Sequence, residues 1–318
     1  MKIEYTQTLR TQAARLGYLG ISTNMNKRVA IFGAAGQLGV ELVAEFGRRN
    51  YEVHRFTRQQ IDISDPAQVD RCLTAIDPAV VLNSAAYNMV DLAEQDPDAA
   101  YRANALAVRN LAVTCRQLDS KLVHFSTDYV FDGTAGRPYV ETDETHPLGA
   151  YAVSKLAGEL YARAYSDAAL VIRTSGVFGP GGRATARGNF VELMLRLAAE
   201  QPTSGKPIRV VEDHVASPTY SPALARVTAD LVERDACGIY HGGGGQAISW
   251  FDYARLIFRL AGLQPELRPT NEREYRTAAR RPKFSALDNA RLRADGVAPM
   301  PPLEAAVAEY LANTKASR

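Results

Sequence analysis

The chain has 318 residues, of which 46% are hydrophobic and 23% charged, and 37 basic against 35 acidic side chains give a formal net charge of +2. This is an ordinary globular composition, which excludes a disordered chain and a coiled coil. The near balance of charge also argues against a protein that coats nucleic acid or an anionic membrane, because such proteins need an excess of Lys and Arg, so we expect a small-molecule ligand.

Residues 1–26 precede the first clear strand and include a second methionine, Met25. We expect them to form a disordered extension outside the fold. They lack the apolar run of a secretory signal, and no run of 18 apolar residues occurs in the chain. The cysteines, Cys72, Cys115 and Cys237, are odd in number and scattered, which favours a reducing cytoplasm over a disulfide framework. The spacing of the histidines predicts no metal site.

From Arg28 onward, short apolar strands alternate with amphipathic helices. The predicted strands are 28–33, 51–56, 79–86, 121–126 and 169–178, and the predicted helices are 37–49, 66–76, 97–118 and 150–165. The strands contain few alternating polar positions, which is typical of parallel strands buried on both faces. The pattern predicts an α/β fold with a doubly wound parallel (Rossmann) sheet.

Beyond Val177 the sequence pattern changes: a Gly- and Arg-rich loop is followed by more widely spaced predicted elements. We expect helices at about 190–200, 222–234, 249–261 and 303–312, and strands at 208–211 and 238–241. The Rossmann domain is predicted to comprise residues 27–178 plus about 208–241. A smaller C-terminal substrate-binding lobe is predicted from about 179–207 and 242–318, with the glycines of 242–245 as a flexible turn.

The first strand leads directly into a glycine turn and a helix, the order that binds a dinucleotide pyrophosphate. Gly33 permits a tight turn, Gly36 lets backbone amides approach the phosphates, and Gly39 lets the helix pack on the strand. Gln37 and Leu38 lie within this turn and complete the candidate site. The alternative is a simple turn with a helix cap.

The end of the second strand distinguishes NAD from NADP, because a carboxylate there would bind the ribose 2′-hydroxyl and a cation the 2′-phosphate. The chain offers Arg55 and Arg58 and no carboxylate. We therefore expect NADP(H) to be preferred, with NAD(H) as the second choice, and Arg58 or Arg55 as the phosphate partner unless both are solvated charges. Asp62 could approach the adenine edge or cap the next helix, where Asp65 competes.

Tyr151 and Lys155 are four residues apart and so share one face of a predicted helix. A nearby ammonium lowers a phenol pKa, which makes Tyr151 usable as an acid or base near neutral pH. The pair alone is weak evidence, since a surface helix could carry it by chance. It gains weight because it follows the glycine turn and Ser126–Asp128 at the end of a buried strand.

With these motifs the sequence resembles the extended short-chain dehydrogenase/reductase family, and within it the dTDP-4-dehydrorhamnose reductases. The resemblance covers nearly everything from Lys27 to about Leu311. It rests on segments such as GAAGQLGVEL, HFSTDYVFDG, AYAVSKLAGE, RTSGVFG and VEDHVASPTY.

The resemblance implies reduction of a nucleotide-linked 4-keto-6-deoxy sugar, with dTDP-4-dehydrorhamnose going to dTDP-L-rhamnose, and it allows a homodimer. It implies that Tyr151 is the proton donor, that Lys155 holds the nicotinamide ribose, and that Thr127 hydrogen-bonds the substrate carbonyl. It also implies cofactor contacts by Asp62, Ile63, Ala85, Ala86 and Tyr87, and substrate contacts by Asp128, Tyr129, Gly176, Asn189 and Phe190.

The chain departs from the family pattern in two places. Gly176 stands where rhamnose-forming members usually carry Trp, and the loop that follows is longer and richer in Gly and Arg. Both departures make another 4-keto-hexose nucleotide an alternative substrate. Arg183, Arg187 and Arg281 are candidates for the pyrophosphate, or else solvated surface charges. Trp250, the only tryptophan, is predicted to lie in the core of the lobe.

Two other functions compete with the reductase. A nucleotide-sugar epimerase or dehydratase of the same fold would retain NAD and regenerate it in each turnover. A non-catalytic regulatory subunit is the other alternative, because the methionine adenosyltransferase β-subunit is similar to this reductase group and fold alone does not fix function.

Overall fold

The computed structural model of the chain describes residues 27–184 and 188–316. The extension predicted at residues 1–26 lies outside these ranges. No helix within them combines the length and apolar character needed to span a bilayer.

Six parallel strands form the central sheet, which confirms the predicted doubly wound fold. In spatial order they are β2 (Glu52–Phe56), β1 (Arg28–Phe32), β3 (Val80–Asn83), β4 (Lys121–Thr127), β5 (Leu170–Thr174) and β8 (Gly238–His241). All neighbours are parallel, so all six strands end at one edge. The strand order reverses between β1 and β3, which is where open α/β sheets bind ligands.

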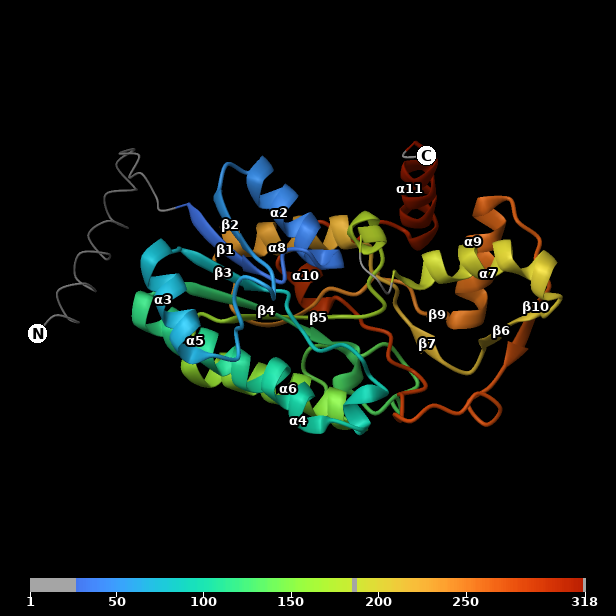
Figure 1. The fold of residues 1–318 in the computed structure, drawn as a ribbon, viewed down its shortest axis with the longest axis horizontal. Helices are drawn as coiled ribbons and strands as arrows, with labels where there is room; N and C mark the ends of the chain where they lie inside the picture. The colour runs from blue at the N-terminus through green and yellow to red at the C-terminus, as the bar shows by residue number, and fades with distance from the viewer. Residues whose placement is uncertain (1–26, 185–187, 317–318) are drawn as a thin grey trace, which may run out of the picture.

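Helices cover both faces of this sheet (Figure 1). On one face α2 (Gln37–Arg48) packs against α8 (Ser221–Glu233), and the other face carries α3 (Pro66–Ile76), α5 (Ala107–Leu118) and α6 (Ala150–Tyr165). Successive strand residues point to opposite faces. Ile31 accordingly joins the core under α2 and α8, while its neighbour Ala30 joins the core under α3 and α5.

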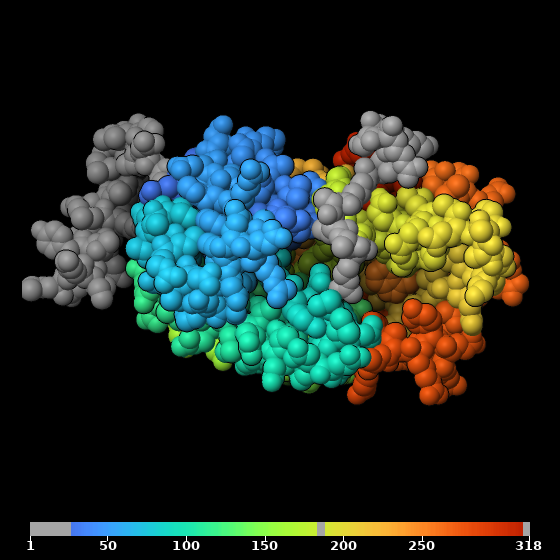
Figure 2. All heavy atoms as spheres, in the orientation of Figure 1, coloured from blue at the N-terminus to red at the C-terminus, as the bar shows by residue number. Residues whose placement is uncertain are grey.

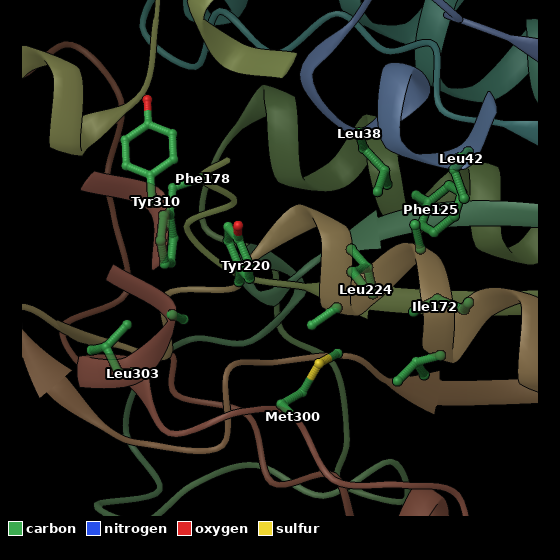
Figure 3. Close-up of a cluster of buried hydrophobic side chains, with 14 of the residues drawn as sticks. Leu38, Leu42, Phe125, Ile172, Phe178, Tyr220, Leu224, Met300, Leu303 and Tyr310 are labelled. Atoms are coloured by element: carbon green, nitrogen blue, oxygen red, sulfur yellow. The ribbon is translucent and has the colours of Figure 1, made fainter. Parts of the chain in front are cut away.

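The core under α2 and α8 continues into the C-terminal lobe. Figure 3 shows Leu38, Ile172 and Leu224 of the sheet region in one cluster with Phe178 and Tyr310, and all five side chains are buried. Because apolar burial favours a fixed arrangement of both parts, the lobe is held against the edge where the strands end.

The helix predicted at 97–118 is interrupted in the structure. It consists of α4 (Pro97–Tyr101), a π-helical turn (η2, Arg102–Leu106) and α5. Asp96 accepts a hydrogen bond from the backbone N–H of Ala99 and caps the first turn, as its position before Pro97 favours. The π-turn carries Asn104, whose contacts are described with the site.

The lobe has small sheets of its own. β6 (Ile208–Val211) pairs with β10 (Leu267–Thr270), and β7 (Val215–Ala216) pairs with β9 (Ile248–Ser249). The partner of β6 therefore comes from a segment that follows it by more than fifty residues. The lobe helices are α7 (Phe190–Ser204), α9 (Trp250–Ala261), α10 (Ala290–Ala294) and α11 (Leu303–Ala316), and three short 3-10 turns complete the chain, η1 (Leu92–Glu94), η3 (Asp128–Val130) and η4 (Pro180–Ala184).

The glycines of 242–245 do not form the flexible turn expected from the sequence. Three of them, Gly242 to Gly244, are buried. A Cβ at Gly244 would lie 1.9 Å from the carbonyl oxygen of Pro218, and one at Gly243 would lie 2.7 Å from Oγ of Ser217. These glycines allow two backbone segments to approach closely behind the end of β5.

Candidate active site

The glycine turn after β1 brings three segments together at the switch point of the sheet. Gly33 has φ +76°, and a Cβ there would lie 2.6 Å from the backbone nitrogen of Ala85, just beyond β3. A Cβ at Gly39 would lie 2.1 Å from the carbonyl oxygen of Gly33, so α2 packs directly on the turn. The helix begins with Gly36 as its N-cap and has no side-chain cap. This uncapped positive helix end fits an anionic pyrophosphate.

The other turn residues have distinct environments. Leu38 is buried in the core under α2. Gln37 donates a hydrogen bond from Nε2 to the carbonyl oxygen of Val177 at 2.5 Å, so its side chain faces the segment leading into the lobe. Its backbone N–H stays at the helix start, where a phosphate would approach.

The segment after β2 is largely exposed. Arg55 and Arg58 are both exposed. Asp62 accepts hydrogen bonds from N and Oγ of Ser64 at 2.9 and 2.8 Å, while Asp65 caps α3. The cap role therefore belongs to Asp65, and Asp62 closes a turn at the surface.

Tyr151 and Lys155 lie on the first two turns of α6, next to the end of β4. Lys155 is 3% exposed, and its ammonium donates a hydrogen bond to the carbonyl oxygen of Phe125 at 2.5 Å. Burial lowers the pKa of Lys155 to about 8, and the negative charge of Glu159 opposes this shift. The Tyr151 ring is half-buried, with its centroid 6.2 Å from that of Tyr129. Thr127 ends β4 beside Thr174 of β5.

A buried ion pair joins this helix to the sheet, and the sequence analysis did not identify it. Glu159 (1% exposed) and Arg173 (2% exposed) pair at 2.8 Å between α6 and β5. Ser126 donates a hydrogen bond to the same carboxylate, and the Arg173 guanidinium stacks 5.1 Å from the centroid of the Phe131 ring. Glu159 follows Lys155 by four residues, so the i, i+4, i+8 series from Tyr151 was the available signal.

Asn104 in the π-turn is a second residue that the sequence analysis missed. Its amide Nδ2 donates to the carbonyl oxygen of Tyr87 at 2.9 Å and to Oγ of Ser154 at 3.0 Å, and its Oδ1 accepts from the Tyr87 N–H at 2.8 Å. The π-turn thereby fixes the backbone of the Ala86–Tyr87 segment against α6. π-turns are frequent at functional sites.

The expected substrate residues lie in different environments. Tyr129 is half-buried beside Tyr151, whereas Asp128 is buried. Asn189 caps α7 and also donates from Nδ2 to Oη of Tyr310 at 3.2 Å, so its side chain faces the protein interior. Phe190 stacks on Tyr253 with a 5.3 Å centroid separation.

Gly176 has φ +49°, and a Cβ there would lie 3.2 Å from Cη2 of Trp250. The tryptophan is half-buried and its ring centroid lies 4.7 Å from that of Phe190. The side chain that was expected in the lobe core therefore also borders the end of β5.

The three candidate arginines differ in what the structure shows. Arg281 forms an ion pair with Asp91 at 2.6 Å, which joins the C-terminal tail to the segment after β3. Arg187 and the side chain of Arg183 lie outside the described residues.

Figure 2 shows a hollow between the blue-to-cyan half of the molecule and the yellow-to-orange lobe. No group of three His, Cys, Asp or Glu side chains that could hold a metal occurs among the described residues.

Comparison with known proteins places this geometry among sugar-nucleotide enzymes. A family model described as RmlD substrate binding domain matches residues 27–316. The chain is 39% identical to a dTDP-4-dehydrorhamnose reductase of Mycobacterium tuberculosis over 293 residues, which cover 90% of this chain and 93% of that protein. It is 35% identical to a dTDP-4-keto-6-deoxy-D-glucose reductase of Streptomyces niveus over 278 residues, which cover 87% and 93%.

Among solved structures, a dTDP-4-dehydrorhamnose reductase from Bacillus anthracis in complex with NADP has a TM-score of 0.85 and 35% identity. The match covers 91% of this chain and 100% of that one.

Proposed function

The chain belongs to the dTDP-4-dehydrorhamnose reductase group of the extended short-chain dehydrogenases/reductases, and from this premise we propose that it reduces the 4-keto group of dTDP-4-dehydrorhamnose to give dTDP-L-rhamnose. One observation carries the proposal. Thr127, Tyr151 and Lys155 lie on adjoining elements, the end of β4 and the start of α6, at the edge of the sheet that also carries the glycine turn. A ketone reductase needs a hydrogen-bond donor, a proton donor and a fixed cation together at such an edge.

The residues at the switch point fit a dinucleotide cofactor, for which we propose NADP(H) over NAD(H). The uncapped start of α2 would hold the pyrophosphate, and the close approach of Gly33 to Ala85 leaves no side chain in its way. Exposed Arg58 would meet a 2′-phosphate, with Asp62, Ile63, Ala86 and Tyr87 along the cofactor's path. Bound NADPH supplies the hydride for the carbonyl carbon.

The protein's own groups handle the proton and the charge. Tyr151 donates its phenolic proton to the carbonyl oxygen as negative charge develops there, and Thr127 supplies a hydrogen bond to the same oxygen. The Lys155 ammonium, which has three donors, uses one on Phe125 and keeps the others for the ribose and for stabilising the Tyr151 phenolate. Its burial strengthens that electrostatic effect, because charges interact more strongly away from water.

The division of labour between the two parts of the chain is also proposed. The cofactor belongs to the Rossmann part, and the sugar nucleotide lies between the sheet edge and the lobe, near Tyr129, Gly176 and Phe190. The pairing of β6 with β10 favours assigning residues 208–211 to the lobe. The cytoplasm remains the proposed compartment.

The test is product identification with the full-length protein. It would be incubated with dTDP-4-dehydrorhamnose and either NADPH or NADH, and the product identified by NMR and mass. We expect dTDP-L-rhamnose and a higher kcat/KM with NADPH. Turnover of dTDP-4-keto-6-deoxy-D-glucose alone would keep the reductase chemistry but change the sugar. Absence of product from either substrate, in protein that binds NADPH, would overturn the proposal.

A further inference from the structure

A buried carboxylate lies directly behind the catalytic edge of β4. Asp128 is 4% exposed and follows Thr127 in the chain. Its Oδ1 accepts a hydrogen bond from Oγ1 of Thr127 at 3.1 Å. Its Oδ2 accepts from Oγ of Ser175 at 2.8 Å and from Oγ of Ser285 at 2.5 Å. Three hydroxyl groups thus converge on one carboxylate.

The three hydroxyls come from segments that are far apart in the chain. Thr127 ends β4, Ser175 directly follows β5, and Ser285 lies in the tail that returns from the lobe. The N–H of Ser285 also donates to the carbonyl oxygen of Val215 in β7 at 2.8 Å. Asp128 therefore connects the ends of two central strands to the two-stranded sheet of β7 and β9.

The energetics of burial explain why this arrangement is specific. A carboxylate removed from water is costly unless hydrogen bonds replace its hydration, and hydrogen bonds to a charged group are stronger than neutral ones. Burial raises the pKa of Asp128 to about 6, and the bonds from Ser285, Ser175 and Thr127 oppose that shift. The three hydroxyl bonds therefore replace part of the hydration that the buried carboxylate has lost.

The single hydroxyl proton of Thr127 links this cluster to the proposed reduction. A threonine hydroxyl has one proton to donate, and here that proton is directed to Asp128. The hydroxyl oxygen in turn accepts from the N–H of Tyr129 at 3.2 Å. Both contacts fix the Thr127 rotamer, so the hydroxyl oxygen keeps its place while its proton turns from Asp128 to a substrate carbonyl.

We propose that Asp128 is a positioning residue whose carboxylate sets the orientation of the Thr127 hydroxyl and, through Ser285, locks the lobe's return segment to the catalytic edge of the sheet. This role differs from the substrate contact that the family resemblance implies for Asp128. It deepens the proposed function and rests on it for the part that concerns catalysis.

Two substitutions separate the two halves of the role. Asp128→Asn removes the charge and disturbs both Thr127 and Ser285, so kcat should fall about 10- to 100-fold, the loss expected for a hydrogen bond to a charged group. Ser285→Ala keeps the Thr127 contact and removes only the link to the lobe. It should raise KM for the sugar nucleotide several-fold and leave kcat within about twofold, since the chemical step is intact. Asp70→Asn, at an exposed position on α3, is the matched control.

Hydrogen–deuterium exchange gives a readout that does not depend on turnover. The backbone N–H at position 285 should exchange faster in Ser285→Ala and Asp128→Asn than in the wild type or Asp70→Asn, because the return segment is released. Unchanged exchange in both variants, or an equal loss of kcat in both, would overturn the proposal. If the wild type turns over no sugar nucleotide, the proposed function fails while the exchange experiment still decides the structural link. If Asp128→Asn does not fold, Ser285→Ala decides through its exchange and its KM.

Discussion

Two strands that end at the catalytic edge of the sheet, the interior strand β4 and the outer strand β2, are built in opposite ways. All seven residues of β4 are buried, and polar groups just behind its end are paired with buried partners. β2 forms the outer edge of the sheet (Figure 1), none of its residues is buried, and the arginines in and after it face solvent. Under the proposed function, this contrast separates residues proposed to carry the reaction from residues proposed to select the cofactor.

The contrast has a physical basis in the cost of burying charge. Lys155, Glu159 and Arg173 have little water to replace a lost partner, so one substitution leaves another charge uncompensated. An exposed arginine is already solvated and gains or loses little when its neighbours change. Substitutions at the β4 end should therefore affect rate and stability, and those at the β2 end should affect cofactor preference alone.

The largest effect is expected at Tyr151. Tyr151→Phe removes the proposed proton donor but keeps the ring, so kcat should fall about 10²- to 10⁴-fold, the usual contribution of general acid catalysis. NADPH affinity should stay within about twofold because the ring still packs. Steady-state kinetics and a binding titration measure both. Tyr161→Phe, ten residues further along α6, is the control. An equal loss of rate in that variant would contradict the assignment.

Breaking the buried ion pair should have the next largest effect. Glu159→Gln leaves Arg173 buried without its counter-charge, which should cost about 3–5 kcal/mol in the free energy of unfolding. Urea unfolding measures this cost. The exposed pair Arg196–Glu200, 3.9 Å apart, provides the control, because Glu200→Gln should cost under about 1 kcal/mol.

Glu159→Gln should also change the pH dependence of kcat/KM. Lys155 must be charged to act, so kcat/KM should fall as the pH rises through its pKa of about 8. Glu159 raises that pKa, and its neutralisation should shift this alkaline limb of the profile to lower pH. An alkaline limb that stays in place would show that Glu159 has no influence on Lys155.

At the exposed end, the expected change is one of preference. Arg58→Ala should raise KM for NADPH roughly tenfold through the loss of a charge-assisted hydrogen bond and leave KM for NADH unchanged. Arg55→Ala tests the alternative phosphate partner, and Arg71→Ala, exposed on α3, serves as the neutral control. Equal changes in the two KM values would contradict a 2′-phosphate contact.

The smallest effect is expected at Gly176. Gly176→Ala meets a positive φ and the Trp250 ring, so it should lower stability by about 1–2 kcal/mol. Gly136→Ala has a similar φ of +64° and nothing within 4 Å of the added Cβ, so the difference between the two variants in urea unfolding isolates the Trp250 contact. Equal destabilisation of Gly176→Ala and Gly136→Ala would show that the Trp250 ring moves aside at no cost in stability.

Local patterns in the sequence predicted the parts of this site that depend on neighbouring residues. The glycine turn follows a strand and opens a helix, and Tyr151 and Lys155 are a helical pair, so spacing marked both as candidates and the order of the motifs along the chain gave the pair its weight. The parallel order of the sheet followed from apolar strands that alternate with helices.

Contacts between distant segments were outside the reach of such patterns. The partner of Glu159 is on β5, two of the three hydroxyl partners of Asp128 are 47 and 157 residues away, and β6 joins a strand that appears late in the chain. The interruption at Arg102–Leu106 also has no local signal, because Ala-rich helical sequence runs through it. These features follow from packing between elements.

The most direct test of the central claim counts cofactor against product. Nicotinamide absorbance and dTDP-sugar product would be followed together in the wild type with dTDP-4-dehydrorhamnose and NADPH. The account predicts one NADPH consumed for each dTDP-L-rhamnose formed. Conversion of the sugar nucleotide with no net loss of NADPH would contradict it and would indicate an epimerase or dehydratase that regenerates its cofactor.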